Sequence, residues 1–140
     1  MYSISLSQTM ARNYSNNGQH AEQLYRYTMT GKVVKADNKP YYLGADLGDV
    51  QVKSARATIC NGTDLDAHLS ADKADRYAWV TADFSTAYIM TKAEYKVFAE
   101  TFAEVTTGSK GSNGGKVKMR FRRNADRKGI NLDKWLEARV

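Results

Sequence analysis

Hydrophobic and polar positions recur with different periods along the chain, and the first clear pattern has helical spacing. Residues 19–30 place Ala21, Leu24, Tyr25 and Met29 on one face of a helix. A single apolar stripe of this kind is typical of a helix that packs on the core of a globular domain. We therefore expect residues 19–30 to form an amphipathic helix.

The middle of the chain has the pattern of short strands separated by turn-forming residues. Segments 41–46 and 49–60 are strand-like and are separated only by Leu47-Gly48, which predicts an antiparallel hairpin. Two further strands are expected at 76–82 and 85–90, with a loop or short helix at 61–75.

The remaining third of the chain predicts two helices and a strand. Thr91 followed by Glu94 matches a capping box, so a helix is expected from there to about residue 105, burying Tyr95, Phe98, Ala99 and Phe102. A strand is expected at 116–122 and a short helix at 132–139. The complete order predicts one α/β (α+β mixed) domain over residues 1–140, with a central mixed β-sheet flanked by helices.

Composition narrows the class of protein. Apolar residues make up 42% and charged residues 26% of 140, which is ordinary for a globular protein and excludes a disordered or fibrous chain. No apolar run approaches the ~20 residues of a membrane span, so we expect no membrane partner. Cys60 is the only cysteine, and no secretory signal is evident. We therefore expect a cytoplasmic, intracellular protein.

The net charge of +6 is concentrated at one end of the sequence. Residues 110–140 contain ten Lys and Arg against three Asp and Glu, whereas residues 1–109 contain eleven against twelve. A localised basic segment indicates a polyanionic partner, with nucleic acid the first candidate and an acidic membrane surface the second. The alternative is a solvated basic face without a partner.

The predicted hairpin gathers polar side chains on one face. With Leu47-Gly48 as the turn, Asp46 is opposite Asp49, and alternation adds Gln51 and Lys53 to the same side of the sheet. Carboxylates and an amide carbonyl suit Mg²⁺, and a lysine can stabilise charge at phosphorus or orient a water. The other face is apolar and consists of Leu43, Ala45, Val50 and Val52.

This arrangement resembles the active-site hairpin of the PD-(D/E)xK nuclease superfamily, in which an acid on one strand precedes an acid, a spacer and a lysine on the next. Here Asp46 is followed by Gln51-Val-Lys53, and Glu22 on the first predicted helix matches an additional acid of the family. The resemblance implies a restriction-endonuclease-like core with Lys53 acting on the attacking water. It implies Mg²⁺, for which Mn²⁺ can substitute, held by Asp46, Gln51, Glu22 and Asp49.

Two positions depart from the family pattern. Ala45 precedes Asp46 where the family has proline, and Gln51 occupies the acidic position. A glutamine supplies one neutral oxygen, which Asp49 on the same face could supplement. Equally, the substitution could mark a nuclease that binds without cutting.

A second pattern places cations along the predicted strand 116–122. Its basic residues alternate with Val117, Met119 and Phe121, which predicts a cationic face above an apolar one. Such a face would contact phosphates, although an edge strand protected by charge is the alternative. The expected DNA contacts are Lys116, Lys118, Arg120, Arg122, Arg123, Arg127 and Lys128, with Ser54 and Arg56 continuing the Gln51 and Lys53 face.

These patterns together predict a Mg²⁺-dependent DNA endonuclease of the restriction or homing type. Cutting both strands of double-stranded DNA needs two active sites, so a homodimer or higher homo-oligomer is expected. The alternatives are a catalytically inactive nucleic-acid-binding module, and a small interaction or inhibitor protein with a basic face.

Overall fold

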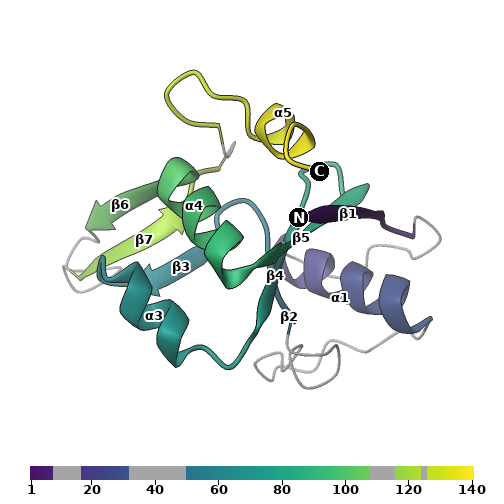
Figure 1. Cartoon of the computed structure of the whole chain (residues 1–140), viewed down its shortest axis with the longest axis horizontal. Helices are drawn as coiled ribbons and strands as arrows, with labels where there is room; N and C mark the ends of the chain where they lie inside the picture. The colour runs from purple at the N-terminus through teal and green to yellow at the C-terminus, as the bar shows by residue number, and fades with distance from the viewer. Residues whose placement is uncertain (8–16, 32–49, 108–115, 124–125) are drawn as a thin grey trace.

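The computed structural model of the chain describes residues 1–7, 17–31, 50–107, 116–123 and 126–140, and its strands form two sheets (Figure 1). One sheet has the order β1-β5-β4-β2 and the other the order β3-β7-β6. The strands are β1 (Tyr2–Ser5), β2 (Val50–Lys53), β3 (Thr58–Asn61), β4 (Arg76–Val80), β5 (Thr86–Thr91), β6 (Ala103–Thr107) and β7 (Val117–Phe121). The helices are α1 (Asn17–Thr30), α3 (Leu65–Ala71), α4 (Lys92–Phe102) and α5 (Leu132–Glu137).

The four-stranded sheet is mixed and has helices on both faces. β5 pairs antiparallel with β1 and β4, while β4 pairs parallel with β2. Alternate residues of β4 are buried on opposite sides, Tyr77 and Trp79 toward α4 and Ala78 and Val80 toward α1. The expected α+β class, with a mixed sheet flanked by helices, is confirmed.

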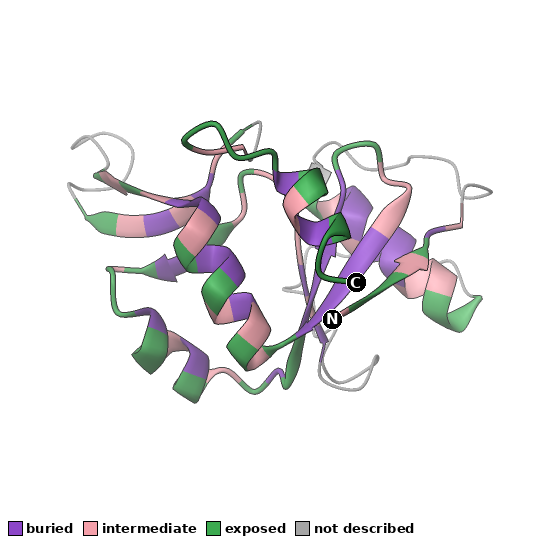
Figure 2. Cartoon of the chain, turned by 45° about the horizontal axis from the view of Figure 1, so that its top comes forward, coloured by how far each residue is buried: buried purple, intermediate pink, exposed green. Residues whose placement is uncertain are grey.

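The larger core is aromatic and joins the two sheets. The ring of Phe98 on α4 lies with its centroid 5.2 Å from Trp79 of the first sheet and 5.2 Å from Phe121 of the second. Trp135 on α5 closes this core from outside, 5.9 Å from Phe98. Figure 2 shows the buried residues running along the inner faces of both sheets and α4. This packing fixes β2 of one sheet beside β3 of the other.

The smaller core lies between α1 and the other face of the four-stranded sheet. Leu24 and Tyr25 of α1 pack in a cluster with Val50 and Val52 of β2. The expected helix is confirmed, but Met29 is 54% exposed and does not belong to its buried stripe. Met29 lies in the last turn of α1, which is exposed.

Two predicted boundaries are wrong for identifiable backbone reasons. The strand expected at 49–60 divides into β2 and β3, which belong to different sheets, because the chain turns between them. Arg56 there has a left-handed φ of 70°, and the amide of Ala57 donates to the carbonyl of Ser54 at 3.1 Å. The helix expected to reach residue 105 ends at Phe102, where Ala103 turns extended and β6 begins.

Other predicted elements are confirmed with small shifts. Strands occupy most of 76–82, 85–90 and 116–122, and the short helix in 61–75 is α3. The capping box of α4 is present, with the amide of Glu94 donating to Thr91 Oγ1 at 3.2 Å and the amide of Thr91 donating to Glu94 Oε1 at 3.0 Å. β1 is not predicted, because the N-terminal segment is polar overall and the alternation of Tyr2 and Ile4 with serines spans only four residues.

Candidate functional site

β2 presents Gln51 and Lys53 on one face, as the alternation predicts. Val50 and Val52 are buried against the α1 side, whereas Gln51 and Lys53 are half-buried on the other side. In the parallel pairing with β4, Gln51 lies beside Tyr77 and Lys53 beside Trp79. The buried neighbouring strand therefore fixes the positions of both polar side chains.

The expected extension of this face to Ser54 and Arg56 is wrong. β2 ends at Lys53, and the turn that follows buries Ser54 to 6% exposure. Arg56 lies in the left-handed region at φ 70° and is exposed. Neither residue continues the strand, so the alternation that would align them with Lys53 has already been lost.

Lys53 is held where the two sheets approach each other. Its Nζ donates a hydrogen bond of 2.9 Å to the carbonyl oxygen of Thr58 on β3. Burial lowers the pKa of Lys53, and the negative charges of Asp72 and Glu22 oppose that shift. The half-buried Lys53 side chain therefore has its ammonium group positioned by a backbone carbonyl.

Glu22 on α1 lies within electrostatic range of Lys53. Burial raises the pKa of Glu22 to about 7, although the positive charges of Lys53 and Arg26 act in the other direction. Its Oε2 atom is buried and has no hydrogen-bond partner among the described residues. Since α1 begins at Asn17, Glu22 lies beyond the first turn of the helix. A carboxylate in this state gains from a bound cation or a proton.

Asp46 and Asp49 lie outside the described residues, as does the Leu47-Gly48 turn of the hairpin. Their convergence with Gln51 and Lys53 stays a prediction. Within the described ranges, no group of three or more His, Cys, Asp or Glu is arranged to hold a metal ion. The carboxylate of Glu22 and the carboxamide of Gln51 are the described members of the predicted metal-binding set, and both are oxygen donors of the kind Mg²⁺ accepts.

Gln23 is a polar residue of α1 that the sequence analysis did not single out. It is only 1% exposed, and neither its Oε1 nor its Nε2 has a partner in the described part of the chain. A buried primary amide normally makes hydrogen bonds. The sequence shows that Gln23 is adjacent to Glu22 on the predicted helix. It does not predict the burial of Gln23, because glutamine side chains are usually exposed.

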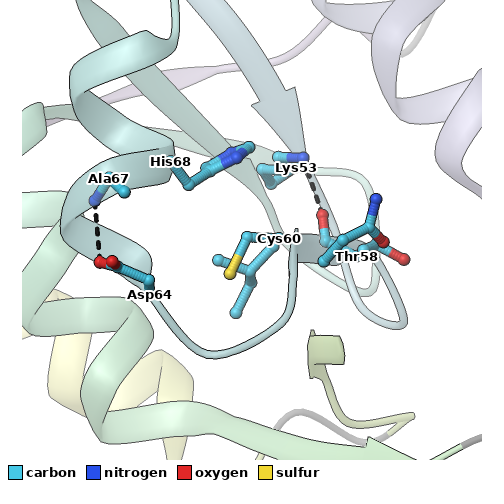
Figure 3. Close-up of a pocket in the computed structure, with 8 residues that line it drawn as sticks. Lys53, Thr58, Cys60, Asp64, Ala67 and His68 are labelled. Carbon is cyan, nitrogen blue, oxygen red and sulfur yellow. Dashed lines mark hydrogen bonds between the residues drawn. The ribbon is translucent and has the colours of Figure 1, made fainter. Parts of the chain in front are cut away.

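His68 of α3 faces Lys53 across a pocket (Figure 3). Burial lowers the pKa of His68, Lys53 lowers it further and Asp72 raises it. Asp72, which follows α3, also accepts a short hydrogen bond from the hydroxyl of Tyr77. The sequence assigns His68 no role, because His68 and Lys53 come together only through the packing of α3 near the end of β2.

The cationic strand β7 is less exposed and better paired than expected. Met119 and Phe121 are buried, as predicted, but Val117 is 39% exposed. Glu104 on the neighbouring β6 lies 3.3 Å from Arg120 Nε and 3.8 Å from Arg122 Nε. The predicted cationic face therefore also contains an acid, which the sequence does not reveal because Glu104 falls in a segment that predicts a helix.

β7 is also not an edge strand. It lies between β3 and β6 in the described sheet, so charge protection of an edge does not explain its cations. Lys116 precedes the strand and is exposed, and Lys118 is half-buried. Lys118 and Arg120 lie on β7 at alternate positions, as predicted, while Lys116 and Arg122 flank the strand at its two ends.

The other expected DNA contacts follow β7 without continuing it. Arg123 is exposed beside a small cavity of about 40 Å³ that Asp126 and Asp133 also line. Arg127 closes a tight turn with Ile130, and Lys128 within that turn has a left-handed φ of 51°. The three cations therefore lie on a loop toward α5 and not on the face of the sheet.

Comparison with models of known protein families, with curated protein sequences and with solved structures finds no match to this chain. The described helices include none with the length and apolar character needed to cross a membrane. The site must accordingly be interpreted from its own geometry.

Proposed function

We propose that the chain is a divalent-metal-dependent endonuclease that hydrolyses phosphodiester bonds of double-stranded DNA. The observation that supports this most is the position of Gln51 and Lys53 on one face of β2, with the buried carboxylate of Glu22 in electrostatic range of Lys53. An amide, a lysine and a carboxylate around one strand end suit an anionic substrate better than they suit packing.

Glu22 and Gln51 carry oxygen atoms of the kind that Mg²⁺ accepts, and α1, which carries Glu22, covers the face of β2 opposite to Gln51. Glu22 has a buried oxygen without a partner among the described residues, and Gln51 offers a carboxamide oxygen. The predicted ligands Asp46 and Asp49 would complete the set. When bound, Mg²⁺ supplies Lewis-acid stabilisation of phosphate charge and lowers the pKa of a coordinated water.

Lys53 is the residue that we assign to the reacting phosphate. Hydrolysis forms a bond between phosphorus and a water oxygen, breaks the bond from phosphorus to one sugar oxygen, and transfers a proton to the departing oxygen. Negative charge accumulates on the phosphate oxygens as this occurs. An ammonium that the Thr58 carbonyl already holds in place stabilises that charge with little reorganisation.

The cations of β7 and the following loop are the surface that we assign to DNA binding. Lys118 and Arg120 pair across the sheet with Asn61 and Thr58 of β3, next to the segment that holds Lys53. Such cations bind phosphates without reading the sequence. Cutting of both strands would then require two copies of the chain, which we propose act as a homodimer or higher homo-oligomer inside the cell.

The experiment that tests this proposal is cleavage of plasmid and phage DNA in Mg²⁺, Mn²⁺ or EDTA. We expect metal-dependent cutting that falls by at least about 100-fold in Lys53→Met, because the variant removes a charge acting on the transition state. Lys134→Met, which removes an equal charge from the exposed surface of α5, serves as the matched control and is expected to cut normally. Discrete fragments would identify a site-specific enzyme.

Two outcomes would contradict the proposed nuclease activity. If wild type cuts no DNA but retains it in a salt-sensitive manner, the chain is a nucleic-acid-binding module in which Gln51 leaves the site inert. If it neither cuts nor retains DNA, the basic surface serves a protein partner.

A further inference from the structure

A pocket of about 530 Å³ opens beside Lys53, between the end of β2, strand β3 and helix α3. Its volume is within the ~300–1,000 Å³ typical of sites for small organic molecules. Figure 3 shows the side chains of Lys53 and His68 directed toward each other at one side, with Asp64 at the start of α3 farther from Lys53. Phosphodiester hydrolysis alone does not need a pocket of this size.

The pocket lining is chemically mixed. Lys53 and His68 contribute nitrogen atoms that suit an anionic oxygen, and Ile59 and Ala67 contribute apolar surface. Asn61 and Asp64 contribute an amide and a carboxylate, and the N-cap bond to Ala67 uses only Oδ1 of Asp64. A ligand that matches this lining has an anionic end, an apolar part and an edge that both donates and accepts hydrogen bonds.

The rim of the pocket is continuous with the cations of β7. Thr58 and Asn61 line the pocket and are the cross-strand partners of Arg120 and Lys118. Paired residues of adjacent strands lie on the same side of a sheet, so a polyanion bound along β7 passes the pocket mouth. The ligand is thus expected to be part of a nucleic-acid strand.

We infer that this pocket receives one unpaired nucleotide of the bound strand, with its phosphate at Lys53 and His68 and its base edge at Asn61 and Asp64. The inference rests on the proposed function and extends it, because the base in the pocket would then influence where the strand is cut. Removing a base from the stack costs a few kcal/mol, so a mismatched or single-stranded nucleotide would enter most readily.

Binding is tested with the four deoxynucleoside monophosphates in EDTA, followed by the backbone amide NMR signals of the full chain. We expect saturable shifts at residues 58–68 that differ among the four bases. Inorganic phosphate alone should shift only signals near Lys53 and His68. The inference is overturned if no nucleotide shifts these signals, or if phosphate reproduces the whole effect.

Variants separate base recognition from phosphate binding. Asn61→Ala is expected to weaken nucleotide binding about tenfold and to reduce the difference among bases, as loss of a specific hydrogen bond should. His68→Ala is expected to weaken nucleotide and phosphate alike. Ser70→Ala, exposed on the same helix, is the matched control and should change neither. Equal behaviour of Asn61→Ala and the control would contradict base recognition.

The two proposals can fail separately because the titration contains no divalent metal. Nucleotide binding without any DNA cleavage would contradict the proposed nuclease activity and support the nucleotide pocket. Metal-dependent cleavage without nucleotide binding at residues 58–68 would support the nuclease activity and contradict the pocket.

Discussion

β2 carries one cation, Lys53, and β7 carries two, Lys118 and Arg120, and these charges lie in different surroundings. Arg120 on β7 and Arg122 just after it share Glu104 on the adjacent strand, on a surface that water reaches. On β2, burial lowers the pKa of Lys53 and raises that of Glu22 although each charge favours the ionised form of the other. An ion pair at the surface changes the free energy of unfolding little. A partly buried pair with shifted pKa values is typical of a candidate functional site.

The variant with the largest expected effect is Glu22→Gln, which tests whether the Glu22 carboxylate is buried in the folded chain. In the folded chain Glu22 has a pKa of about 7 against an ordinary 4.5, so the unfolded chain releases this proton first and stability falls as pH rises from 4.5 to 7. The Glu22→Gln variant should not lose stability over this pH range, because glutamine does not titrate. It should be about 1–2 kcal/mol more stable than wild type at pH 8, a value reduced from full linkage because Glu22 is partly exposed.

Urea unfolding at pH 5 and pH 8 measures this difference, and cleavage assays on the same samples measure its functional counterpart. We expect DNA cleavage by Glu22→Gln to fall about tenfold or more, since a metal-binding carboxylate is replaced by a neutral amide. Identical pH dependence of unfolding in both proteins would show that Glu22 is solvated after all.

Arg120→Met probes the other side of the comparison. Loss of one phosphate contact should weaken DNA binding about 3- to 10-fold and reduce the slope of log K against log salt by about 1. The cleavage rate at saturating DNA should be unchanged, in contrast to Lys53→Met. Fluorescence anisotropy over a salt series gives the affinity, and a rate loss at saturation would place Arg120 in the reaction itself.

Glu104→Gln has the smallest expected effect. It releases Arg120 and Arg122 from their shared partner and should strengthen DNA binding about 2- to 3-fold with a steeper salt slope. The cost in stability should stay below about 1 kcal/mol, because both ion pairs are at the surface. Weaker DNA binding by this variant would mean that Glu104 holds the arginines in their binding geometry.

The sequence predicted most of the local structure, because helical and alternating patterns persist wherever a single face is buried. One such pattern is the alternation on β2 of buried Val50 and Val52 with polar Gln51 and Lys53. The capping box at Thr91 is a separate local signal that marks the start of α4. It did not predict the division after Lys53, since that depends on the left-handed backbone at Arg56 and on a second sheet being available.

The candidate site was predicted only as far as it is local. Gln51 and Lys53 lie two residues apart, so their shared face follows from the pleat of a strand. The sequence does not associate His68 and Asp72 with Lys53, because α3 approaches Lys53 through packing between distant segments. The pairing of Arg120 with Glu104 was missed for the same reason, as β6 had been assigned to a helix.

The succession of β4, β5 and α4 has a consequence for the order in which the chain folds. These elements are adjacent in sequence, and the turn between the strands is held by Asp83, which accepts hydrogen bonds from the hydroxyl groups of Thr81 and Ser85 at 2.7 Å. β3 must instead wait for β7, which is synthesised much later, because loops that close over long distances form slowly.

We therefore expect β4, β5 and α4 to acquire protection from hydrogen exchange first during refolding, and β3 and β7 last. Pulse-labelling measures that order, and simultaneous protection of both sheets would contradict it. In that sequence Lys53 belongs to an early-forming sheet but receives its Thr58 contact only when the late sheet docks, so the last folding event assembles the site.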